Sequence, residues 1–279
     1  MTAADVAVEE AAPAKINLAL HVTGQRADGY HLLDSLVAFA DAGDRVTARA
    51  ATRTRLRVTG PMAAGVPEDN DNSVLRAAAL IGVSADLTLD KHLPAAAGIG
   101  GGSSDAAATL RALARLSGRA LPGDALSLGA DVPVCLLAGA ARMRGIGEDV
   151  AAVDGLPALD AVLVNPRVPV ATPAVFARLE RRENAGMPAV LPRWRDAADC
   201  AHWLAAQRND LEAPARALCP EIGAVLEALR AGGGCTLARM SGSGATCFGL
   251  CPDAGTARAE AARIAAARPD WWVVATRLS

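Results

Sequence analysis

A glycine-rich run that leads into a helix constrains this chain more than any other feature of its sequence. Residues 93–116 read LPAAAGIGGGSSDAAATLRALARL. Glycine permits positive φ and lets another group approach the backbone closely. After the serines, alanine and leucine recur at helical spacing, and Gly118 predicts the end of the helix. A loop of this kind before a helix N-terminus favours binding of an anion, above all a phosphate.

Two known phosphate-binding patterns do not match this run. A Walker A loop needs a lysine before its serine or threonine, and none is present here. The dinucleotide fingerprint needs a third glycine at the position of Ser103 and a strand before the loop, whereas Pro94 and three alanines precede it. A helix entry without a ligand is the alternative. Because ordering so many glycines and serines costs conformational entropy, we favour a bound ligand.

Composition excludes several classes of protein. With 279 residues the chain has room for one large or two modest domains, and its net charge of −2 argues against a nucleic-acid or membrane-surface partner. The first 15 residues lack the apolar region of a signal peptide, and no apolar run could span a bilayer, so we expect a cytoplasmic protein. The six cysteines form no CxxC pair, which predicts buried, reduced thiols.

The first half of the chain shows several strand and helix patterns. Alternation predicts a strand over 16–22, and the Val-, Thr- and Arg-rich stretch 45–59 predicts two edge strands of a hairpin or meander. A helix is expected over 73–81 and a short strand over 85–89.

The second half predicts the order strand, helix, strand, strand, helix, strand, which is typical of a ferredoxin-like α+β domain. Its first strand is expected over 159–165, and we place the domain boundary just before it, giving domains 1–156 and 157–279. A second glycine-serine loop, 241–244, lies between two of the strands, while 181–198 is irregular and able to flex over a site.

Four side chains outside the loop are candidates for chemistry. Lys15 precedes a buried strand and is either solvated or a fixed cation. Asp131 lies among apolar residues and is either a helix or strand cap, or a base or metal ligand. Tyr30, the only tyrosine, and His31 follow a turn. They form either an amphipathic pair at a strand edge or a stacking platform for a flat ring.

Three stretches together resemble the GHMP small-molecule kinases: Pro13-Ala14-Lys15 with Asn17, the GxGGGSS core of 94–106, and MSGSGA at 240–245. GQRADGYHLLDSLV, LGADVPV and NDLE resemble, more narrowly, the subgroup that acts on a cytidine diphosphate-linked methylerythritol. The resemblance spans residues 13–251, nearly the whole chain.

The resemblance implies a two-domain α+β fold with the active site in the cleft between the domains. By this resemblance, the N-terminal domain should be ribosomal-protein-S5-like and bind ATP, and the C-terminal domain should be ferredoxin-like. It implies phosphorylation of the substrate's 2-hydroxyl by ATP in the non-mevalonate route to isoprenoids. Catalysis of phosphoryl transfer is mainly positioning and charge stabilisation, and Mg²⁺ needs few protein ligands beside the phosphates.

The resemblance also implies roles for individual residues. Asp131 is the expected general base and Lys15 the cation near the attacked hydroxyl. The residues expected to bind ATP are Pro94, Gly98, Gly100, Gly101, Gly102, Ser103, Ser104 and, near the adenine, Asn72. Ser103 or Ser104 is the expected metal ligand. The residues expected to bind the substrate are Asn17, Tyr30, His31, Thr172, Phe176, Gly242, Ser243 and Gly244.

Two other functions are compatible with parts of the pattern. A non-catalytic nucleotide-binding module would keep the loop, but the presence of Lys15 and Asp131 disfavours it. Another GHMP kinase, for homoserine, mevalonate or a sugar, is disfavoured by the turn at 28–31. We expect a small-molecule substrate and a monomer or weak homodimer.

Overall fold

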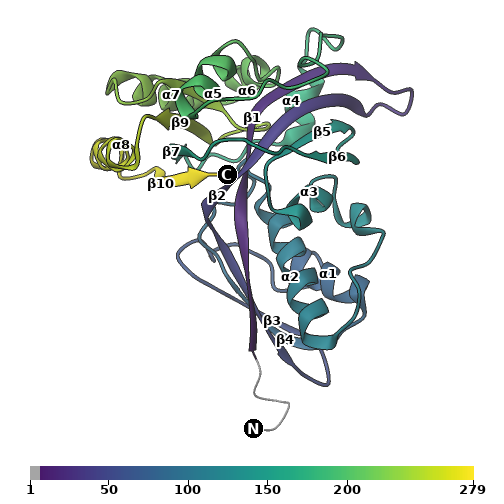
Figure 1. The fold of residues 1–279 in the computed structure, drawn as a ribbon. Helices are drawn as coiled ribbons and strands as arrows, with labels where there is room; N and C mark the ends of the chain where they lie inside the picture. The colour runs from purple at the N-terminus through teal and green to yellow at the C-terminus, as the bar shows by residue number, and fades with distance from the viewer. Residues whose placement is uncertain (1–6) are drawn as a thin grey trace. The chain divides into compact units, whose positions relative to one another are not determined.

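The computed structural model describes residues 7–279, which form two compact units. Of the described residues, the first unit contains 7–14, 42–95 and 100–138, and the second contains 15–41, 96–99 and 139–279. Two long strands, β1 (Ala7–Gln25) and β2 (His31–Ala50), therefore contribute to both units (Figure 1). The boundary predicted before residue 157 divides the chain into family domains and not into these compact units, so it stays a prediction.

The first unit contains a sheet in which the order of strands differs from their order in the chain. β3 (Arg55–Thr59) pairs in parallel with β4 (Ala85–Asp90), which in turn pairs antiparallel with the end of β2. The prediction of a hairpin or meander over 45–59 is thus wrong, because β4 lies between the two strands. Alternation identifies a strand but does not identify its neighbour, and a parallel neighbour requires a crossover through a helix.

That crossover contains α1 (Ser73–Ile81), which was expected over these residues. Asn72 caps its start by accepting a hydrogen bond from the backbone N–H of Val74 at 2.9 Å, and left-handed Gly82 ends it. α1 packs against α2 (Gly101–Ser117), the helix that follows the glycine run and ends at Gly118. A 3₁₀ turn (Ala125–Leu128) and α3 (Val132–Leu137) complete the unit.

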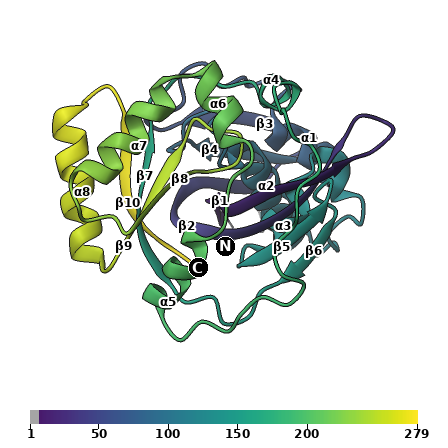
Figure 2. The same ribbon diagram turned by 90° about the horizontal axis from the view of Figure 1, so that it is seen from above.

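The second unit contains an antiparallel sheet with the strand order β10-β7-β9-β8. Its strands are β7 (Leu159–Asn165), β8 (Leu237–Met240), β9 (Cys247–Cys251) and β10 (Trp272–Leu278). In chain order the sheet runs fourth, first, third, second, and the helices α7 (Glu221–Ala231) and α8 (Ala254–Ala267) pack on it (Figure 2). The ferredoxin-like prediction is confirmed.

The second unit contains further helices and strands besides this sheet and its two helices. α4 (Thr172–Ala177), α5 (Ala197–Ala205) and α6 (Glu212–Leu218) lie between β7 and α7 in the chain. β5 (Ala141–Gly145) pairs with the first part of β2 and with β6 (Asp149–Ala152). Thr172-Pro173 is a local helix-start signal that indicates α4, whereas α5 and α6 were not predicted.

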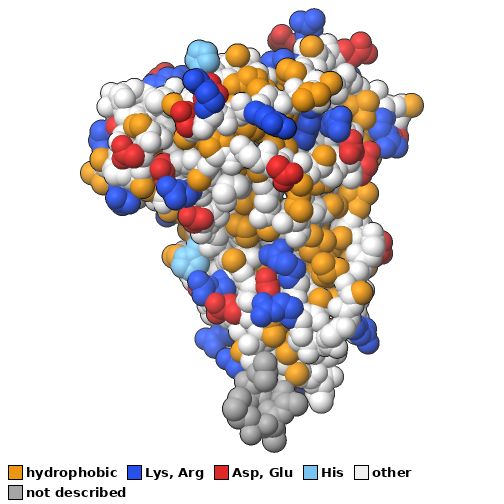
Figure 3. Space-filling view, viewed as in Figure 1, with side chains coloured by type: hydrophobic (Ala, Val, Ile, Leu, Met, Phe, Trp, Pro, Cys, Tyr) orange, Lys and Arg blue, Asp and Glu red, His pale blue; other side chains and the backbone are white. Residues whose placement is uncertain are grey.

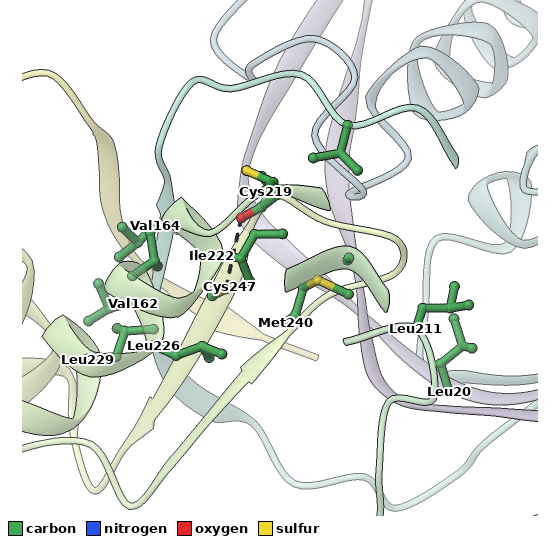
Figure 4. Close-up of a cluster of buried hydrophobic side chains, with 14 of the residues drawn as sticks. Leu20, Val162, Val164, Leu211, Cys219, Ile222, Leu226, Leu229, Met240 and Cys247 are labelled. Atoms are coloured by element: carbon green, nitrogen blue, oxygen red, sulfur yellow. Dashed lines mark hydrogen bonds between the residues drawn. The ribbon is translucent and has the colours of Figure 1, made fainter. Parts of the chain in front are cut away.

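Aliphatic side chains fill the core of the second unit with little help from aromatic rings. Figure 4 shows Val162 and Val164 of β7 beside Leu226 and Leu229 of α7, all of them buried. Aromatic residues make up only 3% of the chain, so valine, leucine and alanine must supply most of the buried area. Figure 3 shows that charges of both signs are interspersed on the face it presents. Within residues 7–279, no helix combines the length and apolar character that crossing a bilayer requires.

Backbone groups in the middle of the irregular segment 181–198 form hydrogen bonds with side chains of β2 and β5. Arg142 of β5 forms a bidentate pair with Asp34 of β2, at 2.7 and 2.8 Å. The same guanidinium donates to the backbone carbonyls of Met187, Pro188 and Ala189, and the Met187 N–H donates to Asp34. A buried ion pair thus satisfies backbone groups of a segment that has no helix or strand before Ala197.

A second buried arginine, in β8, binds backbone groups of β1 and of the C-terminal end of α5. Arg239 donates hydrogen bonds of 2.8 Å to the carbonyls of Leu18, Leu204 and Gln207. Burial lowers the pKa of this guanidinium to about 10, so it remains charged at neutral pH. Without it, the carbonyls of Leu18 and Gln207 would lose this donor, whereas the Leu204 carbonyl would keep the backbone N–H of Gln207 as its donor.

We expect Arg239→Met to lower the free energy of unfolding by about 2–4 kcal/mol, because the methionine fills the space but donates to none of the carbonyls. Urea denaturation followed by circular dichroism measures this loss. Arg258→Met, on the exposed face of α8, is the matched control and should change stability by less than about 0.5 kcal/mol. Equal stability of the two variants would contradict the role given to Arg239.

Candidate active site

The glycine run begins α2 with a backbone conformation that suits an anion site. Gly100 is the N-cap residue, with φ of 64°, and no side chain caps this helix end. The serines, residue types that suit either the cap or the first turn, therefore lie in the first turn and not at the cap. The first N–H groups of a helix have no partner within the helix and lie at the positive end of its dipole. They can accordingly bind a phosphate without any side-chain donor.

Two other segments of the first unit meet α2 at this end. A Cβ added at Gly102 would lie 3.6 Å from the hydroxyl of Ser73, at the start of α1. A Cβ added at Gly129 would lie 3.6 Å from the hydroxyl of Ser103. The turn that carries Asp131 is therefore next to the first turn of α2. The starts of α1, α2 and α3 lie together, and the carboxylate of Asp131 makes no capping hydrogen bond to its own helix.

The two serines of the run have different environments. Ser104 is fully buried, and its hydroxyl donates to the carbonyl of Pro13 at 2.7 Å. Ser103 is only half-buried. Asn72 is also buried, and its amide both caps α1 and donates to the carbonyl of Pro67. Pro94 is buried as well. The sequence indicated Asn72 or Ser73 as the cap of α1, but it did not indicate the hydrogen bond of Ser104 to Pro13.

A buried cluster of three charged groups lies beside the start of α2. The ammonium of Lys91 binds the carboxylates of Asp44 and Asp105, the latter at 3.1 Å. Asp44 also accepts from the backbone N–H groups of His92 and Leu93, 2.8 Å in the case of Leu93. A Cβ at Gly101 would come within 3.3 Å of the Lys91 ammonium. No sequence pattern indicated this cluster, because its members are far apart in the chain and each alone resembles a solvated charge.

The cluster holds two carboxylates and one cation, so its charge is unbalanced. Burial raises the pKa of Asp105 to about 7, and the negative charge of Asp44 adds to this effect against the opposing influence of Lys91. One oxygen of Asp105 finds no hydrogen-bond partner among the described residues. Near neutral pH, Asp105 can therefore take up a proton on that oxygen.

In the second unit, β1 joins two loops that are distant in the sequence. Lys15 and Asn17 are both buried, with 4% of each residue's surface exposed. The backbone N–H of Lys15 donates to the carbonyl of Ile99 at 2.9 Å, and that of Asn17 donates to the hydroxyl of Ser241 at 3.0 Å. The side-chain amide of Asn17 donates to the hydroxyl of Ser35. The β1 backbone thus fixes both glycine loops.

The two glycine loops of this unit touch through their backbones. Gly98 has φ of 71°, and a Cβ there would lie 2.6 Å from the carbonyl oxygen of Gly244. A Cβ at Gly242 would lie equally close to the carbonyl oxygen of Gly98. The hydroxyl of Ser241 donates to the same Gly98 carbonyl at 3.2 Å. No side chain could be added at Gly98 or Gly242 without separating the loops.

The motif NDLE at 209–212 fastens the second of these loops. The amide of Asn209 donates to the carbonyls of Met240 and Gly242, both at 2.8 Å. Glu212 accepts from the backbone N–H of Met240 at 3.1 Å. The first and last members of the motif therefore bind the backbone of the loop and of the strand that leads into it.

An aromatic group lies where β2 begins, after the turn closed by Gly29. Tyr30 is 62% exposed, whereas His31 is half-buried and stacks on Phe176 of α4 with 4.8 Å between ring centroids. Burial, with a smaller contribution from Arg182, lowers the pKa of His31, so its imidazole is neutral at pH 7. Its Nε2 atom is buried, and residues 7–279 supply no hydrogen-bond partner for it.

The hydroxyl of Thr172, on the same helix as Phe176, lies 2.7 Å from that of Ser243. Among the predicted site residues, the structure thus brings Tyr30, His31, Phe176 and the loop at Ser243 to one unit. Lys15 belongs to this second unit and Asp131 to the first. Within the described part of the chain, no cluster of three or more His, Cys, Asp or Glu side chains could hold a metal ion.

The chain matches two family models, the GHMP kinases N terminal domain over residues 72–153 and the GHMP kinases C terminal domain over 187–270. It is 60% identical over 268 residues to 4-diphosphocytidyl-2-C-methyl-D-erythritol kinase of Dinoroseobacter shibae, covering 96% of this chain and 93% of that protein. A crystal structure of 4-(cytidine 5'-diphospho)-2C-methyl-D-erythritol kinase is similar with a TM-score of 0.78 and 34% identity, covering 97% of this chain and 99% of the other. Homoserine kinase from Cytophaga hutchinsonii, with a TM-score of 0.66 and 18% identity over 97% of this chain and 94% of that one, shares the fold.

The buried cluster predicts a pH-dependent stability. Because the pKa of Asp105 in the folded protein, about 7, lies above its ordinary value of 3.8, the folded state binds the proton more tightly than the unfolded state does. Stability should therefore fall as pH rises through the interval between these values, by roughly 1 kcal/mol per pH unit. Urea denaturation at several pH values measures it.

Asp105→Asn should remove most of this slope and raise stability at pH 8, because the amide stays neutral. Asp86→Asn, at an exposed position of β4, is the control and should leave the slope unchanged. If Asp105→Asn and the parent chain lose stability equally with rising pH, Asp105 is ionised throughout and the pKa given above is wrong.

Proposed function

Because the chain belongs to the GHMP kinases, and among them to the 4-diphosphocytidyl-2-C-methyl-D-erythritol kinases, we propose that it transfers the γ-phosphoryl group of ATP to the 2-hydroxyl of 4-diphosphocytidyl-2-C-methyl-D-erythritol. This is a step of the non-mevalonate route to isoprenoid precursors. The observation that supports this substrate best is the exposed ring of Tyr30 next to the stacked pair of His31 and Phe176.

The phosphates of ATP are assigned to the start of α2. Backbone N–H groups from Gly100 onward and the helix dipole supply positive potential where the transferring group carries negative charge. Asn72 and Ser73 begin α1 at the same end, which suits a position near the remainder of the nucleotide. Gly98, two residues before Gly100 in the chain, is held in close contact with the loop 241–244.

A divalent cation fits this arrangement without a protein cage. Mg²⁺ keeps several waters and binds mainly through substrate phosphates, with one or two protein oxygens. When bound, it would neutralise charge on the β- and γ-phosphates. Ser103 is the residue we assign to it, since its hydroxyl lies in the first turn of α2 and is half-buried. Ser104 is a poorer ligand because its fully buried hydroxyl is donated to Pro13.

Asp131 is proposed as the general base and Lys15 as the cation near the attacked hydroxyl. The turn of Asp131 lies next to Ser103, and its carboxylate is not used to cap α3. A carboxylate at this position can accept the hydroxyl proton as the oxygen attacks phosphorus. Phosphoryl transfer needs no covalent intermediate with the protein, so one base and several fixed positive groups suffice.

The cytosine is assigned to the aromatic group of the second unit. Tyr30 presents an exposed ring for stacking, and Phe176 holds His31 in a fixed plane. A neutral imidazole has one N–H donor and one acceptor nitrogen, which can read a base edge such as the cytosine amine. Asn17, Thr172, Ser243 and the neighbouring glycines are assigned to the methylerythritol and its diphosphate.

Two other functions receive less support. Homoserine kinase shares the fold at 18% identity, which does not extend to its substrate, and a homoserine site has no need of an exposed tyrosine beside a histidine. A non-catalytic nucleotide-binding module has no need of Asp131 next to the first turn of α2. A monomer or weak homodimer in the cytoplasm stays our expectation for the assembly, and sedimentation analysis would test its size.

Asp131→Asn should lower kcat by about 10²–10⁴-fold, because the amide cannot accept the proton. The affinity for MgATP should barely change, since the backbone of α2 still binds the phosphates. Lys15→Ala should behave similarly. Asp124→Asn, at an exposed site before the 3₁₀ turn, is the matched control with near-normal kcat. Near-full kcat in Asp131→Asn, measured in a coupled ADP-release assay, would make Asp131 a structural residue.

Tyr30→Ala should raise KM for the cytidylyl substrate by about ten- to a hundredfold and leave KM for ATP unchanged, because stacking on an aromatic ring contributes roughly 1–3 kcal/mol per base. Tyr30→Phe keeps the ring and should stay near normal. His31→Ala should chiefly relax the choice between cytidine and uridine esters. If methylerythritol phosphate or homoserine were phosphorylated as well as the cytidylyl ester, the substrate assignment would fail and a generic GHMP kinase would remain.

A further inference from the structure

Two thiols lie within reach of each other at the open end of the β8–β9 hairpin. The sulfur of Cys235, just before β8, is 3.7 Å from the sulfur of Cys251, the last residue of β9. We propose that this pair is a site of reversible oxidation, at which a hydroperoxide converts the two thiols into a disulfide.

The sheet makes room for the Cys235 side chain next to Cys251. A Cβ added at Gly249 would lie only 2.5 Å from the Cys235 sulfur, so this glycine leaves the space that the thiol occupies over β9. Residues two apart in a strand point to the same face, which places the Cys251 side chain on that face too. The hydrogen bond from the Thr236 N–H to the Leu250 carbonyl, 2.8 Å, holds the strands together at this point.

The two sulfur atoms need to move only a short distance to form a disulfide bond. A disulfide has an S–S distance of about 2.0 Å, so the sulfurs must approach by roughly 1.7 Å. Cys235 follows three consecutive glycines, 232–234, which connect α7 to β8 and give its backbone freedom to adjust. Cys251, in contrast, is fixed by the β7–β9 ladder, where it pairs with Asp160.

The environments of the two thiols set the order of events. Cys235 is half-buried, and its pKa is lowered because the Cys251 thiol donates a hydrogen bond to it, with Arg263 helping and Glu260 and burial opposing. The pKa of Cys251 is raised by the same hydrogen bond and by burial. Since the thiolate is the nucleophile, Cys235 reacts first and Cys251 second.

The reaction balances with a hydroperoxide as the only oxidant. The Cys235 thiolate attacks the terminal peroxide oxygen, the O–O bond breaks, and the leaving oxygen takes a proton to form water or an alcohol. Cys235 is now a sulfenic acid. The Cys251 sulfur then attacks the Cys235 sulfur, the S–S bond forms, and the S–O bond breaks. The hydroxide that leaves takes the Cys251 proton and departs as water.

The other cysteines provide internal controls. Cys135, Cys200, Cys219 and Cys247 are buried. Burial raises the pKa of Cys200 to about 12 and raises that of Cys247 as well. Cys219 and Cys247 lie in the apolar core around α7 (Figure 4). These thiols should stay reduced at peroxide doses that oxidise the pair.

Mass spectrometry of the purified full chain tests the proposal. The protein is reduced, treated with hydrogen peroxide, blocked with iodoacetamide and digested with trypsin without reductant. Cleavage after Arg230, Arg239 and Arg258 separates Cys235, in peptide 231–239, from Cys247 and Cys251, in peptide 240–258. We expect these two peptides to be joined, with fragment ions that assign the bond to Cys251 and not to Cys247. The oxidised chain should melt roughly 5–10 °C higher, and dithiothreitol should reverse the shift.

Three variants separate the proposal from simple surface oxidation. C235S should leave Cys251 reduced, and C251S should leave Cys235 as a sulfenic acid that dimedone captures. G249A keeps both thiols but displaces Cys235, so it should slow the cross-link at least tenfold. The proposal is overturned if Cys235 and Cys251 stay unjoined when free glutathione is fully oxidised, or if Cys235 joins Cys247 as readily. Should C251S fail to fold, the peptide map of the parent chain and C235S decide the matter alone.

Discussion

The backbone contact between two glycine loops constrains the conformation of both loops in the second unit. Gly98 and Gly242 meet with their backbones so close that a Cβ on either would lie 2.6 Å from a carbonyl oxygen. Such a contact has no side chains to adjust it, so neighbouring groups must fix it from outside. Asn17 and Asn209 do so, the first through its backbone N–H on Ser241 and the second through two carbonyls. The loop that leads into α2 therefore starts from a rigid position.

This rigidity has a chemical use in a kinase. Phosphoryl transfer is accelerated mainly by fixed positive groups and by correct positions, and a loop that had to order itself around ATP would lose binding free energy in doing so. The first unit contributes to the same end with Ser104 and Asn72, whose side chains bind the backbone around the starts of α1 and α2. The groups left for the nucleotide are mainly backbone N–H groups, which cannot change rotamer.

The sequence predicted most elements of the fold and proposed the residues of the site, but it did not predict how distant segments meet. The helix over 73–81 and the ferredoxin-like half were predictable because caps, glycines and periodic apolar residues are local signals. The parallel pairing of β3 with β4 was not, since alternation in a strand is the same beside either neighbour. The cluster of Lys91, Asp44 and Asp105 was equally hidden, because three separate stretches of chain bring it together.

The NDLE motif illustrates what a family signature can record. It helps to distinguish this subgroup by sequence, yet Asn209 and Glu212 spend their hydrogen bonds on the backbone at 240–242. Asp210 likewise accepts from the backbone N–H of Val22, at 2.7 Å. The motif thus supplies the hydrogen-bond partners that this loop conformation requires. Grafting the loop 240–245 of one GHMP kinase onto another would transfer its conformation only if residues 209–212 travelled with it, so that these two stretches behave as a single exchangeable module.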